Sequence, residues 1–201
     1  MVTDRLIDPK RLNMQELASY LADSAGHWIS SQRELHRAHA RLLPDTTIAA
    51  LRGFFSEETL NRARILRVPV IKNPSFYKEF ENAGESIPLD FSVWSAITFG
   101  DVILVSDDQV PGPPPYSLVF HEMVHLVQYD ELGIFEFARR YVMNFMQNSL
   151  NPLAIPLESM AFDLQLKFEN QMDKPFFAEA DIRANIDKHG LPYSGRRDDA
   201  R

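Results

Sequence analysis

Two histidines and a glutamate stand close together in His121–His125, which reads H-E-x-x-H. On an α-helix, residues four positions apart lie on one face, so His121 and His125 can bind a single Zn²⁺ ion. Glu122 would stand beside the metal without binding it, in position to accept a proton from a water molecule there. The pattern therefore predicts metal-assisted hydrolysis, with Glu122 as the general base.

This chemistry requires a helix, and the neighbouring residues favour one. Apolar residues flank the motif from Tyr116 to Gln128, with no internal Gly or Pro. The Pro-rich loop Pro111–Pro115 precedes this segment, Ser117 is a candidate N-cap, and Gly133 is a candidate stop. The alternative interpretation is a buried amphipathic helix whose histidines are satisfied by protein carboxylates or carbonyls.

A third metal ligand must come from elsewhere in the chain. Some zinc enzymes break the helix at a Gly and supply a third His, but here those positions are Gln128 and Glu131. If the helix continues, Glu131 stands roughly 9 Å beyond His125 and does not reach the same metal. Glu158 follows Pro156 in the first turn of a later predicted helix and is the expected ligand. A carboxylate is also favoured at any helix N-terminus, so a purely structural role for Glu158 stays open.

The combination of H-E-x-x-H with a distant E-x-x-A, which begins at Glu158, resembles the gluzincin class of zinc peptidases. The resemblance implies that His121, His125 and Glu158 bind Zn²⁺ and that the substrate is a peptide or protein. In many gluzincins an acidic residue four positions after the ligand Glu supports a ligand His. This chain has Phe162 there and Asp163 one step later, so the sequence does not identify the orienting partners of the histidines.

A longer stretch, from Leu51 to Gln128, is similar to an uncharacterised family of bacterial metallopeptidase-like domains that ends in H-E-x-x-H-x-x-Q. The similar segments are Phe54–Leu60, Arg62–Ile65, Ala96–Ile103 and Phe120–Gln128. The resemblance implies a zincin fold and indicates no general substrate.

The remaining patterns predict an α+β fold: a mostly helical, zincin-like domain with a small antiparallel sheet beside the H-E-x-x-H helix. Further helices are expected at Met14–Leu35 with a break near Gly26, at Ile48–Arg52, after Ser56, and at Phe135–Leu150, Pro156–Asn170 and Phe177–His189. Strands are expected at Arg64–Ile71 and in a hairpin over Val93–Val105 that turns at Gly100-Asp101. We expect one domain over residues 1–193, with an N-terminal helical segment (1–45), a metal-site core (46–193) and a disordered tail at 194–201.

Two further segments bear on the substrate. Phe99–Ser106 is expected to be a strand, either with a free edge that pairs with an extended peptide or within the core. Tyr141 could donate a hydrogen bond to an oxyanion. However, it shares a helical stripe with Ala138, Val142 and Phe145, which favours a core role.

Composition narrows the class of partner. The chain has 201 residues, 45% of them hydrophobic, which is enough for one sizeable core. A net charge of −7 and a pI near 5.4 argue against nucleic acid or an anionic membrane as a main partner. The chain contains no Cys, which excludes disulfides and thiolate metal sites. No signal peptide or transmembrane run is recognised, so a cytoplasmic location is expected, although non-classical export would leave no trace.

These observations predict a zinc-dependent hydrolase, a metallopeptidase with His121, His125 and Glu158 as ligands and Glu122 as base. Two alternatives remain open. One is a zinc-binding but catalytically silent zincin-like interaction domain, which a Glu122 directed away from the metal would favour. The other is a helical interaction protein that binds no metal.

Overall fold

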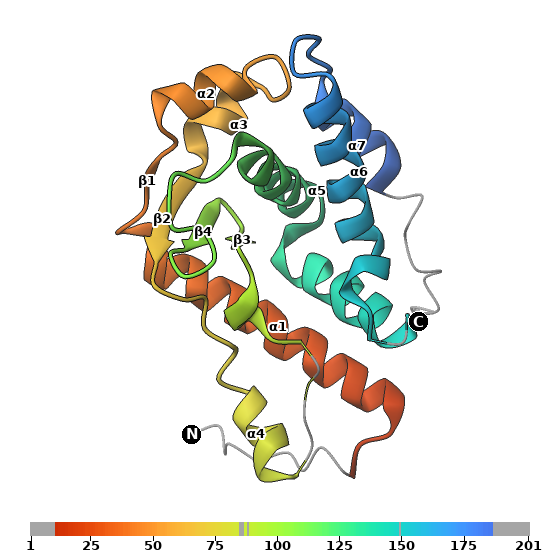
Figure 1. Cartoon of the computed structure of the whole chain (residues 1–201). Coiled ribbons are helices and arrows are strands. Elements are labelled where there is room, and N and C mark those ends of the chain that lie inside the picture. The colour runs from red at the N-terminus through yellow and green to blue at the C-terminus, as the bar shows by residue number, and fades with distance from the viewer. Residues whose placement is uncertain (1–10, 85–86, 88, 149, 187–201) are drawn as a thin grey trace, which may run out of the picture.

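The described part of the chain is an α+β fold in which helices predominate, as the sequence predicts. The computed structural model describes residues 11–84, 87, 89–148 and 150–186 (Figure 1). The expected tail at 194–201 and the expected helix end at His189 lie outside these residues.

The helices are α1 (Met14–Arg37), α2 (Asp45–Leu51), α3 (Glu57–Arg62), α4 (Tyr77–Asn82), α5 (Tyr116–Gln147), α6 (Pro156–Asn170) and α7 (Ala178–Ile186). The strands are β1 (Arg41–Leu42), β2 (Arg64–Val68), β3 (Ala96–Phe99) and β4 (Val102–Ser106).

The four strands form one sheet in the order β1-β2-β4-β3. The expected hairpin is confirmed, because β3 and β4 pair antiparallel. The expectation of a purely antiparallel sheet is wrong, because β2 and β4 pair in parallel. Parallel neighbours need a long crossover, and residues 69–95 provide one between β2 and the hairpin.

The position of β4 also corrects the expected substrate edge. Phe99–Ser106 was the candidate, but β4 lies between β2 and β3 and all five of its residues are buried. The outer strand beside α5, the helix that carries H-E-x-x-H, is instead β3. Its outer side has no strand partner within the described residues.

Two hydrophobic cores cover the two faces of β4. Ile103 and Val105 pack into the core that includes the first half of α5. Val102 and Leu104, which alternate with them, pack into the core that includes Ile29 of α1. The sheet is thereby fixed against α5, the helix that carries H-E-x-x-H.

Helix α1 is continuous, so the expected break near Gly26 is wrong. A Cβ atom at Gly26 would lie 2.5 Å from the ring of Phe135 on α5. The glycine therefore serves a close approach between two helices and does not interrupt one. Asn13 begins α1 with a capping box, in which its side chain accepts from backbone N–H groups and Glu16 bonds back to the Asn13 backbone.

Of the other local predictions, those for the start of α3 and for α6 are confirmed, and that for the start of α5 is not. Ser56 caps α3 by accepting a hydrogen bond from the backbone N–H of Thr59. Helix α6 begins at Pro156 and ends at Asn170, as expected. The expected cap of α5 is wrong, because the helix begins at Tyr116 after Pro115, with no side-chain cap. Neither α5 nor any other helix in the described ranges combines the length and apolarity needed to cross a membrane.

Helix α5 changes direction at Gly133, where the expected stop lies. The backbone there has φ 72° and ψ 164°, which interrupts the helical geometry between two helical halves. This region of conformational space is almost restricted to glycine. The change of direction sets the course of the second half of α5, which carries Phe137 and Tyr141 to the cavity that His121 and His125 also line.

The substitution Gly133→Ala is expected to lower the free energy of unfolding by about 1–3 kcal/mol, because a Cβ strains this backbone conformation. The cost is conformational, since the added Cβ would meet no atom within 4 Å from outside the adjoining backbone of the chain. Gly112→Ala is the matched control, with equally open space and no positive φ. Urea unfolding of both variants checks the difference, and equal stability would contradict the expected strain.

Candidate metal centre

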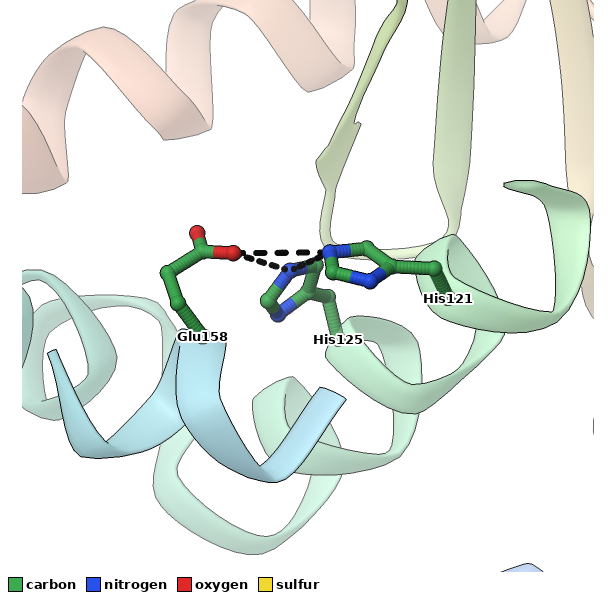
Figure 2. A group of neighbouring side chains, drawn as sticks. All are labelled: His121, His125 and Glu158. Carbon is green, nitrogen blue, oxygen red and sulfur yellow. Dashed lines mark hydrogen bonds and ion pairs between the residues drawn. The ribbon is translucent and has the colours of Figure 1, made fainter. Parts of the chain in front are cut away.

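Three of the predicted site residues meet in one buried cluster. The first half of α5 presents His121 and His125, and the first turn of α6 presents Glu158, so that the side chains point toward one another (Figure 2). The two Nε2 atoms are 3.1 Å apart, and each lies 3.4 Å from the same oxygen of Glu158. Ligand atoms about 2.0–2.2 Å from one tetrahedral metal ion stand roughly 3.3–3.6 Å apart, so this group could hold a metal.

Glu131 takes no part in this cluster, as the sequence predicts. It lies on α5 beyond the histidines, and its carboxylate accepts a hydrogen bond from Arg183 of α7 at 2.6 Å. The choice between Glu131 and Glu158 is therefore decided by the position of α6, whose N-terminus faces the histidine side of α5.

Each histidine is oriented by a glutamine that the sequence analysis did not identify. The Oε1 atom of Gln128 lies 2.9 Å from Nδ1 of His125, and that of Gln165 lies 3.1 Å from Nδ1 of His121. Gln128 donates its amide N–H to the carbonyl of Leu157, and Gln165 donates to Glu169. Because the amide nitrogens are engaged as donors, the amide oxygens accept from the histidines, and each Nδ1 carries the hydrogen.

This arrangement leaves both Nε2 atoms with lone pairs directed at each other and at the carboxylate of Glu158. Three such lone pairs at this separation, buried from water, repel one another unless a proton or a metal ion lies between them. Burial lowers the pKa of the His125 imidazole, but the Glu158 and Glu122 carboxylates and the hydrogen bond to Gln128 together outweigh burial and raise that pKa to about 9. Burial would raise the pKa of Glu158, but His125 and His121 hold that pKa well below its usual range. A proton can thus supply the positive charge in the metal-free protein, and a metal ion can replace it.

The substitution Gln165→Leu is expected to weaken metal binding by about 10–100-fold, because His121 loses the acceptor that fixes its ring and tautomer. Gln165 is only partly buried on α6, so the fold should tolerate the change. The exposed Gln171, at the end of the same helix, provides the matched control Gln171→Leu. Competition with a zinc chelator of known affinity measures the effect, and unchanged affinity in Gln165→Leu would remove the orienting role.

Glu122 lies on the cavity side of α5, close to both histidines. Its side chain is buried, with 4% exposed, and one carboxylate oxygen accepts a 2.7 Å hydrogen bond from the Thr98 hydroxyl. Burial raises the pKa of Glu122, while His121, His125 and Thr98 favour its charged form. Thr98 was missed from the sequence; its signal is that it is the one polar residue of β3.

The hydroxyl of Tyr141 is buried and makes no hydrogen bond of ordinary geometry among the described residues, although the Glu158 carboxylate lies close enough to interact with it. The sequence favours a core role, and the ring does pack against Phe137, with 6.0 Å between ring centroids. Tyr141 also lines the cavity that contains the metal cluster. Burial, together with the Glu158 carboxylate, raises the pKa of Tyr141 well above its usual value, so the group remains a neutral donor. An unpaired buried donor beside a candidate metal centre is available to a ligand.

Phe162 occupies the position where many gluzincins carry an acidic residue. Its ring centroid lies 4.6 Å from that of His121, so the residue packs on the imidazole and does not accept its hydrogen. Gln165, two helical turns after Glu158 on the same face of α6, makes that hydrogen bond instead. The spacing of seven residues places Gln165 on the face of Glu158, but only the packing of α6 against α5 brings it to His121.

The chain has no detectable similarity to proteins of known family, function or structure. No family model, curated protein or solved structure matches this chain. The resemblance to gluzincins therefore rests on the motif residues alone.

Proposed function

We propose that this protein is a zinc-dependent hydrolase, and specifically a metallopeptidase. The observation that carries the proposal is the meeting of His121, His125 and Glu158 around one point, with both imidazoles fixed by amide oxygens. Two imidazoles and one carboxylate, with no fourth protein ligand in the described cluster, are a donor set typical of catalytic zinc. When bound, zinc lowers the pKa of a coordinated water to about 7 and polarises the substrate carbonyl.

The residues around the cluster can move the required proton. Glu122 accepts a proton from the attacking water as the water oxygen bonds to the carbonyl carbon of the peptide. The same carboxylate then passes that proton to the leaving nitrogen as the C–N bond breaks. Thr98 holds the Glu122 carboxylate by its hydrogen bond. The buried Tyr141 hydroxyl lines the same cavity and can donate to the oxygen of the tetrahedral intermediate.

Strand β3 supports a peptide as substrate. It lies at the edge of the sheet, lines the same cavity as Glu122, and has no strand on its outer side within the described chain. An extended peptide can add to such an edge through main-chain hydrogen bonds. The position of Glu122 in the cavity also supports an enzyme over a catalytically silent zinc-binding domain. A silent domain would not need a buried carboxylate beside the metal ligands.

The proposal is tested with an unfolded protein as substrate. The chain loaded with one equivalent of zinc should cut a reduced, alkylated protein into fragments that mass spectrometry can map. A chelator should stop the cleavage, and zinc added in excess of the chelator should restore it. Cleavage that continues at the same rate without metal would contradict the proposal, as would the absence of zinc binding.

A further inference from the structure

A large cavity opens directly onto the metal cluster. Its volume is about 940 Å³, near the upper end of the range of ligand sites. The walls are formed by α1, β3, the second half of α5 and the segment that includes α4. Most of the lining is aromatic or aliphatic, and its largest side chains include Trp28, Phe91, Trp94, Phe137 and Phe145.

Charged side chains are confined to one end of this cavity. Among the described lining residues, the acidic and histidine side chains are those of the metal cluster and Glu122, and there is no Lys or Arg. A free carboxylate or ammonium group in the apolar part would lack a partner, and an unpaired buried charge is strongly unfavourable. The walls therefore disfavour both termini of a peptide chain.

The apolar lining continues to the outside of the molecule. Met14, Leu150, Leu153 and Phe162 line the cavity and are still 71%, 43%, 65% and 44% exposed. Exposed apolar groups that are continuous with a cavity indicate an occupant that is longer than the cavity. The adjacent edge of β3 offers peptide N–H and C=O groups, which favour a polypeptide over an acyl chain.

We propose that the cavity binds an internal, uncharged and apolar segment of a polypeptide. This proposal rests on the proposed function and specifies its substrate class. Cleavage then falls beside aromatic or large aliphatic residues and requires neither the amino nor the carboxyl terminus of the substrate.

Binding can be measured without turnover. The chain has two Trp residues, Trp28 and Trp94, and both line the cavity, so intrinsic fluorescence reports its occupancy. The Glu122→Gln variant, incubated with zinc, is titrated with acetylated and amidated peptides that contain Phe and Leu, and with matched peptides that contain Lys or Glu. The apolar peptide should bind at least about tenfold more tightly, because the charged groups must be desolvated without a partner.

Tighter binding of a charged peptide, or of one with a free terminus, would overturn the proposal. Tighter binding of a long-chain acyl amide would assign the cavity to lipid instead.

Substitutions in the wall locate the binding. Val142 lines the cavity on α5, whereas Gln147 lies exposed on the same helix. Val142→Lys should weaken binding of the apolar peptide at least about tenfold, and Gln147→Lys should leave it unchanged. Should Val142→Lys fail to fold, Ala25→Leu narrows the cavity from α1 without adding charge and should also weaken binding. Undiminished binding in a folded wall variant would contradict the proposal.

The outcomes separate this proposal from the proposed function. Preferential binding of the apolar peptide without any cleavage by the zinc-loaded wild type would retain the cavity assignment and remove the peptidase. Zinc-dependent cleavage directed to charged residues or to chain ends would retain the peptidase and remove the cavity assignment.

Discussion

The substitution Glu122→Gln should abolish peptide cleavage while the protein keeps its metal. A general base contributes about 10²–10⁴-fold to the rate, and the amide cannot accept a proton at neutral pH. The amide is nearly the size of the carboxylate, and its oxygen can still accept the hydrogen bond from Thr98. The measurement is kcat/KM on a peptide that the wild type cleaves, together with zinc content.

Two controls accompany this variant. Glu131→Gln, on the same helix but paired with Arg183, should cleave at the wild-type rate. Burial disfavours the charge of Glu122, so the Tm of Glu122→Gln should equal or exceed that of the wild type. Cleavage by Glu122→Gln at the wild-type rate would show that the hydrolytic mechanism is wrong.

Loss of a ligand should remove the metal. His121→Ala and His125→Ala should each lose most of the zinc, because two remaining ligands no longer close the chelate. Glu158→Gln should weaken zinc affinity by about tenfold or more, since a neutral amide oxygen replaces a carboxylate held between both imidazoles. Elemental analysis after dialysis measures the loss.

Glu131→Gln serves again as the matched control and should keep the wild-type zinc content. Full retention of zinc by both histidine variants would exclude the proposed site. A greater loss in Glu131→Gln than in Glu158→Gln would place the third ligand on α5.

The parts of the site that the sequence predicts are those with local signals. His121 and His125 share a face because of their spacing on one helix, and the helix is marked by its apolar flanks. Glu158 is placed by Pro156, which begins α6 where the sequence indicates. These residues require only the correct secondary structure and one correct helix contact.

The features that the sequence does not predict depend on contacts between distant segments. Parallel pairing of β2 with β4 brings together two strands that are far apart in the sequence, and no short pattern encodes such a contact. Glycine commonly interrupts a helix, so the sequence predicts a break at Gly26. In the structure this glycine instead allows the ring of Phe135, far along the chain, to pack closely against α1. The role of Gln165 likewise appears only once α6 lies beside α5, and the same holds for the lining of the cavity.

We expect that His121, His125 and Glu158 together hold one metal ion. Crystals of the zinc-loaded protein, measured on both sides of the zinc absorption edge, test it most directly. We expect one anomalous peak within about 2.0–2.2 Å of Nε2 of both histidines and of a Glu158 oxygen, with a further coordination position not taken by protein. A peak elsewhere, a fourth protein ligand, or no peak after incubation with zinc would contradict the account.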